Sequence, residues 1–158
     1  MIAPQQRYAL EDLYAEYARR LDDGPLSGWP ELFTEACLYR VVPRENHDAG
    51  LPLAIMHCES RAMLADRVRA VAETIMHEPR YLRHHITNVV PEPHPDGGYA
   101  LRANFSVIEV LQDELPRILC VGRYLDRVVE QSGGELRFAE KLVIYDSVMV
   151  PNTIVYPL

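Results

Sequence analysis

Residues 99–111 read Tyr-Ala-Leu-Arg-Ala-Asn-Phe-Ser-Val-Ile-Glu-Val-Leu, and this run decides how the rest of the chain is interpreted. Apolar and polar residues alternate along it, which is typical of a β-strand with one buried and one exposed face. The predicted buried face carries Leu101, Ala103, Phe105 and Val107. We therefore expect a long strand that belongs to a curved sheet.

Strand patterns also lie on both sides of this run. On its N-terminal side we predict a strand over Leu82 to Val90 and a turn-rich connection over Pro91 to Gly98. On its C-terminal side Pro116 interrupts the pattern, and a further strand is predicted over Ile118 to Val129. Ser132-Gly133-Gly134 then predicts a tight hairpin turn that leads into a last long strand.

Helical patterns occupy much of the first half of the chain. We predict an amphipathic helix over Tyr8 to Asp22, which Gly24-Pro25 ends, and one helical turn over Trp29 to Phe33. Ser60 is the predicted N-cap of a second helix, which Pro79 stops. The apolar stripes consist of Leu10, Leu13, Tyr14, Tyr17, Ala18 and Leu21 in the first helix and of Leu64, Val68, Val71, Ala72 and Ile75 in the second.

Two short strands are predicted between these helices. Cys37 to Val42 forms the first, closed by Pro43, and a polar loop over Arg44 to Gly50 follows it. Leu51 to His57 is predicted to pair with the first strand. Helices followed by a run of strands are typical of an α+β domain, with helices covering one face of a curved sheet. We expect residues 1–158 to form a single domain.

Composition narrows the range of partners. The formal net charge of −7 argues against nucleic acid, because binding to phosphate backbones requires clustered Lys and Arg. We find no apolar run long enough to span a bilayer and expect no signal peptide, so we predict a cytoplasmic protein. Cys37, Cys58 and Cys120 are not spaced as a metal or redox pair, and we expect reduced thiols.

Motifs for metal binding and catalysis are not recognisable in the sequence. The histidines do not form a His-Glu-x-x-His pattern. His84 and His85 are adjacent on a predicted strand, where neighbouring side chains point to opposite faces, so they are poorly placed to hold one metal. A glycine-rich phosphate loop and a nucleophile elbow are also missing from the pattern. We predict neither a metal site nor a catalytic residue in this chain.

A pocket inside the sheet would nevertheless offer acid–base chemistry. Its candidate residues are Tyr14, Asp22, Tyr39, His85, Asn104 and Glu140. Strand parity places Glu140 on the face that carries Leu136, Phe138, Leu142 and Ile144, where an unpaired carboxylate would have a raised pKa. The alternative that we favour is structural, with Glu140 paired to Arg123 on the neighbouring strand.

Arginine and aromatic residues gather in two segments. Arg40, Arg44, Arg80 and Arg83 are near Trp29, Tyr39 and Tyr81 in sequence. These residue types are enriched at the energetic centres of protein interfaces. The alternative is a solvated surface on which long arginine side chains cover the core.

Short motifs in these segments and beyond them carry a family resemblance. They are Trp29, Phe33-Thr34, Cys37-Leu38-Tyr39-Arg40-Val41, Asn46-His47, Gly50-Leu51, Met63-Leu64, Asp66-Arg67, Arg80-Tyr81, Arg83-His84, Gly122, Tyr124-Leu125-Asp126, Asp146-Ser147 and Pro157-Leu158. With them the chain resembles the β (small) subunits of aromatic-ring-hydroxylating dioxygenases, in particular the branch that acts on carboxylated aromatics such as terephthalate.

The resemblance implies a cone-shaped fold like that of nuclear transport factor 2 (NTF2) and scytalone dehydratase, with a strongly curved mixed or antiparallel sheet. It also implies a partner, the catalytic α (large) subunit, in an α3β3 hexamer. That subunit would carry the Rieske 2Fe-2S cluster and the mononuclear iron, and this chain would hold no cofactor. The sequence lacks the Cys-x-His and Cys-x-x-His pairs of a Rieske centre.

We therefore predict a non-catalytic β subunit of an oxygenase for a benzoate-type substrate. The predicted subunit contacts are Arg40, Arg44, His47, Arg80, Tyr81, Arg83 and His84. Ile154 to Leu158 is too apolar for a free tail, and we expect it to pack into a groove on this chain or on a neighbour. The alternatives are a stand-alone dehydratase or isomerase of the same fold and a pure ligand-binding domain.

Overall fold

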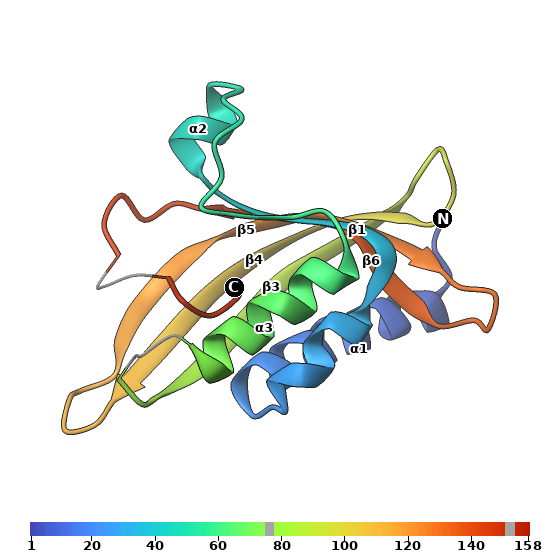
Figure 1. The fold of residues 1–158 in the computed structure, drawn as a ribbon. Helices are drawn as coiled ribbons and strands as arrows, with labels where there is room; N and C mark the ends of the chain where they lie inside the picture. Colours follow the sequence, from blue (N-terminus) through green and yellow to red (C-terminus); the bar gives the residue numbers. More distant parts are fainter. Residues whose placement is uncertain (75–77, 151–153) are drawn as a thin grey trace.

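The structure is a computed structural model that describes residues 1–74, 78–150 and 154–158 (Figure 1). The helical elements are α1 (Pro4–Asp22), the 3-10 helix η1 (Leu26–Leu32), α2 (Arg44–Asp48) and α3 (Arg61–Glu73). The strands are β1 (Phe33–Pro43), β2 (Met56–Cys58), β3 (Arg80–Pro93), β4 (Tyr99–Leu111), β5 (Arg117–Glu130) and β6 (Leu136–Tyr145). In the described ranges, no helix is long and apolar enough to cross a membrane.

The described strands form one sheet in the order β2-β1-β6-β5-β4-β3. β1 and β6 run parallel, and the other neighbouring strands are antiparallel. The sheet curves around α1 and α3, which lie on the same face, whereas α2 projects from the opposite side (Figure 1). This arrangement confirms the predicted α+β fold, in which N-terminal helices pack on a strongly curved mixed sheet that forms a cone.

The run that opened the sequence interpretation forms β4 with the predicted bounds. Leu101, Ala103, Phe105 and Val107 are buried against the helices, as predicted. β3 is longer than predicted and continues to Pro93, through part of the expected turn. A register shift between Thr87 and Val90 allows this, because a β-bulge absorbs an extra residue and lets a long strand bend.

One glycine is required by the sheet itself. A Cβ atom added to Gly122 on β5 would lie 2.0 Å from the backbone oxygen of Ile144 on β6. Real Cβ atoms do not approach backbone that closely, so any larger residue would push the two strands apart. This contact explains why a glycine stands at a strand position.

The helices begin and end for local reasons that the sequence largely contains. The Ser60 side chain accepts a hydrogen bond from the backbone N–H of Met63 at 3.2 Å, which confirms the predicted N-cap of α3. The predicted stripe of α1 is buried at its main positions, and Leu64, Val68 and Val71 are buried in α3. Ala72 is exposed, contrary to prediction, and Ile75 lies outside the described residues.

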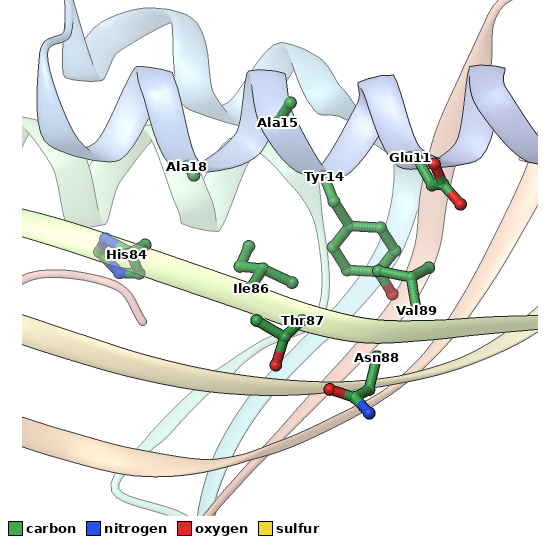
Figure 2. Close-up of a pocket in the computed structure, with 9 residues that line it drawn as sticks. All are labelled: Glu11, Tyr14, Ala15, Ala18, His84, Ile86, Thr87, Asn88 and Val89. Atoms are coloured by element: carbon green, nitrogen blue, oxygen red, sulfur yellow. The ribbon is translucent and has the colours of Figure 1, made fainter.

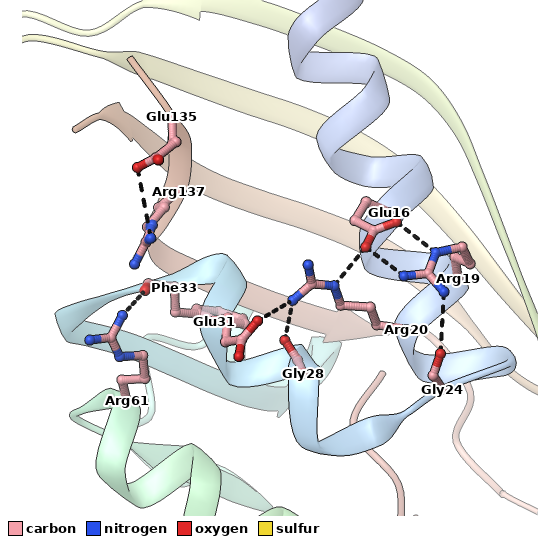
Figure 3. A network of polar contacts seen from close by, with 10 residues as sticks. All are labelled: Glu16, Arg19, Arg20, Gly24, Gly28, Glu31, Phe33, Arg61, Glu135 and Arg137. Carbon is pink, nitrogen blue, oxygen red and sulfur yellow. Dashed lines mark hydrogen bonds and ion pairs between the residues drawn. The ribbon is translucent and has the colours of Figure 1, made fainter. Parts of the chain in front are cut away.

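Charged contacts join α1 to η1 (Figure 3). Glu16 accepts hydrogen bonds from the guanidinium groups of Arg19 and Arg20, each at 2.7 Å. These hydrogen bonds lower the pKa of the Glu16 carboxyl to about 2, and the contribution of Arg19 is the larger one. Arg20 also donates to the carbonyl of Gly28 and pairs with Glu31 at 3.1 Å, which ties the end of α1 to η1.

Two predictions about the segment after β1 are wrong. Residues 44–48 form the short helix α2 instead of a polar loop, with an Arg44–Asp48 ion pair one turn apart at 3.4 Å. The second strand is confined to Met56–Cys58: the backbone N–H of Ile55 still donates to the Val41 carbonyl of β1 at 2.8 Å, and Pro52 further back has no N–H to donate. Residues 44–55 therefore form a projecting segment, which we call the arm (Figure 1).

Candidate functional site

Aromatic rings fill the interior of the cone. Tyr17 of α1 lies at the centre, with its ring 5.6 Å from Phe138 and 6.2 Å from both Trp29 and Tyr124, measured between centroids. Most of these pairs meet edge to face, the arrangement that the ring quadrupoles favour. These rings therefore fill the centre of the cone around Tyr17.

A charged pair is buried within these rings. Lys141 Nζ lies 2.7 Å from Asp126 Oδ2, and both side chains are 0% exposed. The Tyr14 hydroxyl donates to the same carboxylate oxygen at 2.5 Å. Lys141 Nζ also lies 3.6 Å from the centroid of the Tyr124 ring, within the range of a cation–π interaction.

Burial is the largest influence on the pKa values of Lys141 and Asp126. Loss of solvent lowers the pKa of Lys141 to about 8 and raises the pKa of Asp126, although each attracts the other. A carboxyl group with a raised pKa is a familiar general acid or base. Asp126 is sealed from solvent, however, so a substrate has no access to it in this structure.

The prediction that Glu140 shares the buried face of the last strand is wrong. The pairing of β6 with β5 shifts between Arg127 and Val128, so that Phe138 and Lys141 both face the interior. An extra residue in a strand reverses the faces of all residues beyond it. Glu140 is therefore exposed, and Arg123 pairs with Asp48 at 3.7 Å and not with Glu140.

Sequence reasoning consequently missed the buried pair. The burial of Asp126 could have been predicted from the sequence, because Asp126 lies two residues from Tyr124 and from Val128, and all three occupy the same, buried face of β5. The burial of Lys141 could not, because its inward position depends on the shift in pairing between β5 and β6.

A second polar pair lies between α1 and β3. His84 Nδ1 is 2.6 Å from Asp22 Oδ1, and the His84 backbone N–H donates to Asp22 Oδ2 at 2.8 Å. Next to this pair is a cavity of about 390 Å³, and Figure 2 shows Tyr14 crossing it from the helix. The second ring nitrogen of His84, Nε2, is buried and has no partner among the described residues.

The alternative acid–base pocket is not assembled. Tyr14 and Tyr39 point into the core, whereas His85, Asn104 and Glu140 are exposed. The Tyr39 hydroxyl accepts a hydrogen bond from the backbone N–H of Leu158 at 3.0 Å. These five residues cannot converge on one substrate, because the sheet separates them.

The segment Ile154 to Leu158 packs against this chain. Ile154 and Leu158 are buried, and the Tyr17 hydroxyl donates to the Leu158 carbonyl at 2.5 Å. Arg67 of α3 donates to the Val155 carbonyl at 3.1 Å. The prediction that this apolar segment occupies a groove is confirmed, and it closes the cone further.

The arm carries three exposed apolar residues that alternate along the sequence. Leu51, Leu53 and Ile55 are 53%, 71% and 48% exposed. The arm itself projects from the side of the sheet that α1 and α3 leave uncovered (Figure 1). Clustered exposed apolar residues are typical of protein interaction sites. The sequence interpretation missed them, because it assigned this segment to a strand.

The predicted subunit contacts fall into three places. Arg40, Arg44 and His47 lie together where the arm meets the sheet, and Tyr81 and Arg83 are exposed on the edge strand β3. Arg83 pairs there with Asp23 at 2.8 Å.

The remaining two predicted contacts are occupied inside the chain. The Arg80 side chain is nearly buried and pairs with the buried Glu109 at 2.5 Å. His84 binds Asp22, as described above, and its ring is buried.

Metal ligands do not gather in the described ranges. No group of three or more His, Cys, Asp or Glu side chains that could hold a metal ion occurs among residues 1–74, 78–150 and 154–158. Cys37, Cys58 and Cys120 are buried free thiols, and burial raises the pKa of Cys37 and Cys120 to about 11. His77 lies outside the described residues.

Comparisons with known proteins agree with this description. The family model for the ring hydroxylating beta subunit matches residues 16–152. The small subunit of anthranilate 1,2-dioxygenase from Burkholderia cepacia is 35% identical over 146 residues, which cover 92% of this chain and 90% of that protein.

Solved structures place the fold in the same group. A structure from Novosphingobium aromaticivorans, assigned as the β subunit of an aromatic-ring-hydroxylating dioxygenase, is 36% identical with a TM-score of 0.87 and covers 99% of this chain and 98% of that one. A protein assigned as a scytalone dehydratase from the same species shares the fold alone, at 18% identity and a TM-score of 0.73, over 96% of this chain and 91% of that one.

Proposed function

Because this chain belongs to the β (small) subunits of aromatic-ring-hydroxylating dioxygenases, we propose that it serves its oxygenase as a scaffold and performs no chemistry itself. The observation that carries this proposal is that the ionisable side chains at the centre of the cone, Lys141 and Asp126, are paired with each other and fully buried. In a cone that acted as an enzyme, polar groups would face a space open to substrate. Here Asp126, Lys141 and Tyr14 satisfy one another inside packed aromatic rings.

The partner would be the catalytic α (large) subunit, in an α3β3 hexamer. The Rieske 2Fe-2S cluster and the mononuclear iron would both belong to that subunit. The task of this chain would be to hold the α trimer in register, so that the cluster of one α subunit lies near the iron of the next. A benzoate-type substrate is supported by the anthranilate dioxygenase relative. We place the complex in the cytoplasm.

The surface for this partner would include the arm. Its exposed apolar residues suit the desolvated centre of an interface, and the charged residues at its base suit the rim. Of the predicted contacts we retain those whose side chains are exposed or partly exposed, namely Arg40, Arg44, His47, Tyr81 and Arg83. Arg80 and His84 would act indirectly, by supporting β3 from inside.

Co-expression with the α subunit of the same organism tests this function. We expect the two chains to co-purify, with a mass in light scattering that fits α3β3 and with Rieske absorbance that requires α. Leu53→Asp should prevent co-purification, since it places a charge on the apolar arm. The control is Leu115→Asp in the β4–β5 turn, where the leucine is 87% exposed, compared with 71% for Leu53.

Two results would overturn the proposal. One is turnover of a substrate, or stable binding of iron, by the purified chain alone. The other is co-purification that Leu53→Asp and Leu115→Asp leave equally intact, which would remove the arm from the interface.

A further inference from the structure

A second feature of the arm is a cationic pocket at its base, which we call the arm pocket. It measures about 440 Å³. Arg40 of β1, His47 of α2 and His57 of β2 line it, together with the apolar side chains of Val42, Leu51 and Leu142. In the described part of the chain, no Asp or Glu lines this pocket.

The neighbouring pocket on the same face of the sheet shows how unusual this is. It measures about 520 Å³ and shares Leu142 with the arm pocket. Two arginines line it, Arg102 and Arg127, and so do the carboxylates of Glu92, Asp96 and Glu140. This pocket therefore contains carboxylates of this chain beside its arginines, and one of the arginines, Arg102, pairs with Glu92 at 3.2 Å.

Arg40 lacks such a partner. One of its terminal nitrogens, Nη2, donates to the carbonyl of Pro52 in the arm at 3.3 Å. Its Nε is buried and has no partner within the described ranges, as is also true of Arg127 in the neighbouring pocket, but the pocket of Arg40 has no described Asp or Glu in its lining. Arginine presents five N–H donors in a planar fork that matches a carboxylate. Because the described lining of the arm pocket supplies no carboxylate, the guanidinium of Arg40 is available to bind one from outside.

The two histidines do not change this conclusion. His47 Nδ1 lies 3.2 Å from Asp48, and His57 Nε2 lies 3.0 Å from Glu59. Both carboxylates are exposed, and neither lines the pocket. Each imidazole is therefore oriented by an acid at the surface while its ring forms part of the pocket wall.

We propose that the arm pocket receives an aspartate or glutamate side chain of the large subunit, which Arg40 binds through its guanidinium. This inference rests on the proposed function. A protein carboxylate is favoured because the pocket is open and Leu51 of the arm forms one of its walls, so an interface formed by the arm would cover it. Charge complementarity also favours it, since this chain, at −7 overall, leaves a positive pocket without an anion of its own.

The test compares Arg40→Gln with Arg127→Gln in the co-expressed complex. Loss of one partner of a desolvated charge pair costs about 2 kcal/mol or more, so Arg40→Gln should raise the Kd of the complex roughly 30-fold or more. Arg127→Gln, on the same face of the sheet, should leave the Kd within about threefold, because the pocket of Arg127 already contains carboxylates of this chain, among them Glu140. Arg40→Lys should fall between wild type and Arg40→Gln, because it keeps the charge and loses the fork.

The possible outcomes are distinguishable. If the wild-type chains do not assemble, the proposed function fails and this inference fails with it. If they assemble and Arg40→Gln behaves like Arg127→Gln, the inference alone fails. Trp29 fluorescence in urea checks that each variant is folded, and Arg40→Lys supplies the answer if Arg40→Gln is not.

Sodium benzoate and self-association provide the remaining comparisons. In the first, NMR chemical shifts of this chain are followed as sodium benzoate is added. If benzoate shifts them in wild type but not in Arg40→Gln, and Arg40→Gln still binds the large subunit normally, the pocket is a small-molecule site and the inference is overturned. A loss of self-association in Arg40→Gln that leaves binding to the large subunit unchanged would also overturn it, because the carboxylate would then come from a second copy of this chain.

Discussion

Replacement of Lys141 by methionine tests the buried pair most directly. Methionine is close to lysine in length, so the change removes the charge and leaves little empty space. It would strand the Asp126 carboxylate among aromatic rings, where it is 0% exposed and keeps the Tyr14 hydroxyl as a hydrogen-bond donor. Breaking a buried pair in this way costs about 3–5 kcal/mol. The lost cation–π contact with Tyr124 accounts for about 2 kcal/mol of that cost.

The double variant Lys141→Met with Asp126→Asn gives the opposite expectation. The pKa of Lys141 is lowered to about 8, which means that desolvation outweighs the attraction to Asp126. Removal of both charges should therefore recover at least about 2 kcal/mol of the loss in the single variant. An amide oxygen at position 126 would still accept the Tyr14 hydroxyl.

Urea unfolding followed by Trp29 fluorescence measures these differences. Trp29 is the single tryptophan of the sequence and is fully buried, so its emission should change on unfolding. The control is Arg102→Met, which breaks the exposed Arg102–Glu92 pair and should cost less than about 1 kcal/mol. A cost below about 1 kcal/mol for Lys141→Met would refute the reasoning, as would a double variant as unstable as the sum of the two single ones.

Three further predictions concern α1, the last segment and the sheet. Glu16→Gln should lower the unfolding free energy at pH 7, and this difference should disappear as pH falls from 4.5 towards 2, because the depressed pKa of the carboxyl stabilises the fold only while the group is ionised. Leu158→Ala should cost about 2 kcal/mol or more in urea unfolding, as expected for truncating a fully buried leucine. Gly122→Ala should prevent recovery of soluble protein, whereas Gly133→Ala, whose added Cβ meets no atom closer than 3.5 Å, should be recovered normally.

Sequence periodicity predicted the elements whose residues obey one regular pattern. β4 has the predicted bounds, and apolar and polar residues alternate regularly along its centre from Leu101 to Val107. The N-terminus of α3 was predictable because Ser60 supplies its own hydrogen bond to the helix. In both cases the information is local, within one element.

The buried charge was not predictable, because it depends on pairing between strands. The shift in pairing between β5 and β6 reverses the faces of Glu140 and Lys141, and nothing in the residues of β6 marks it. The arm was misread for a related reason. Leu51, Leu53 and Ile55 alternate as a buried strand would, yet they are exposed. Alternating apolar and polar residues indicate that one face of a segment is apolar, but they do not indicate whether this chain or a partner covers that face.

The buried charged pair and the exposed arm are both accounted for by the proposed scaffold function. Burying Lys141 and Asp126 is unfavourable unless each satisfies the other, so their positions are fixed by pairing and not by a substrate. The hydroxyls of Tyr17 and Tyr39 are likewise bound to Leu158, which brings the last segment across the cone. Exposed apolar side chains are unfavourable for a protein that acts alone, and they are retained on the arm. Both features follow if the arm is buried against a partner, because the contact would remove apolar surface from water and a rigid, filled cone would hold the arm in place.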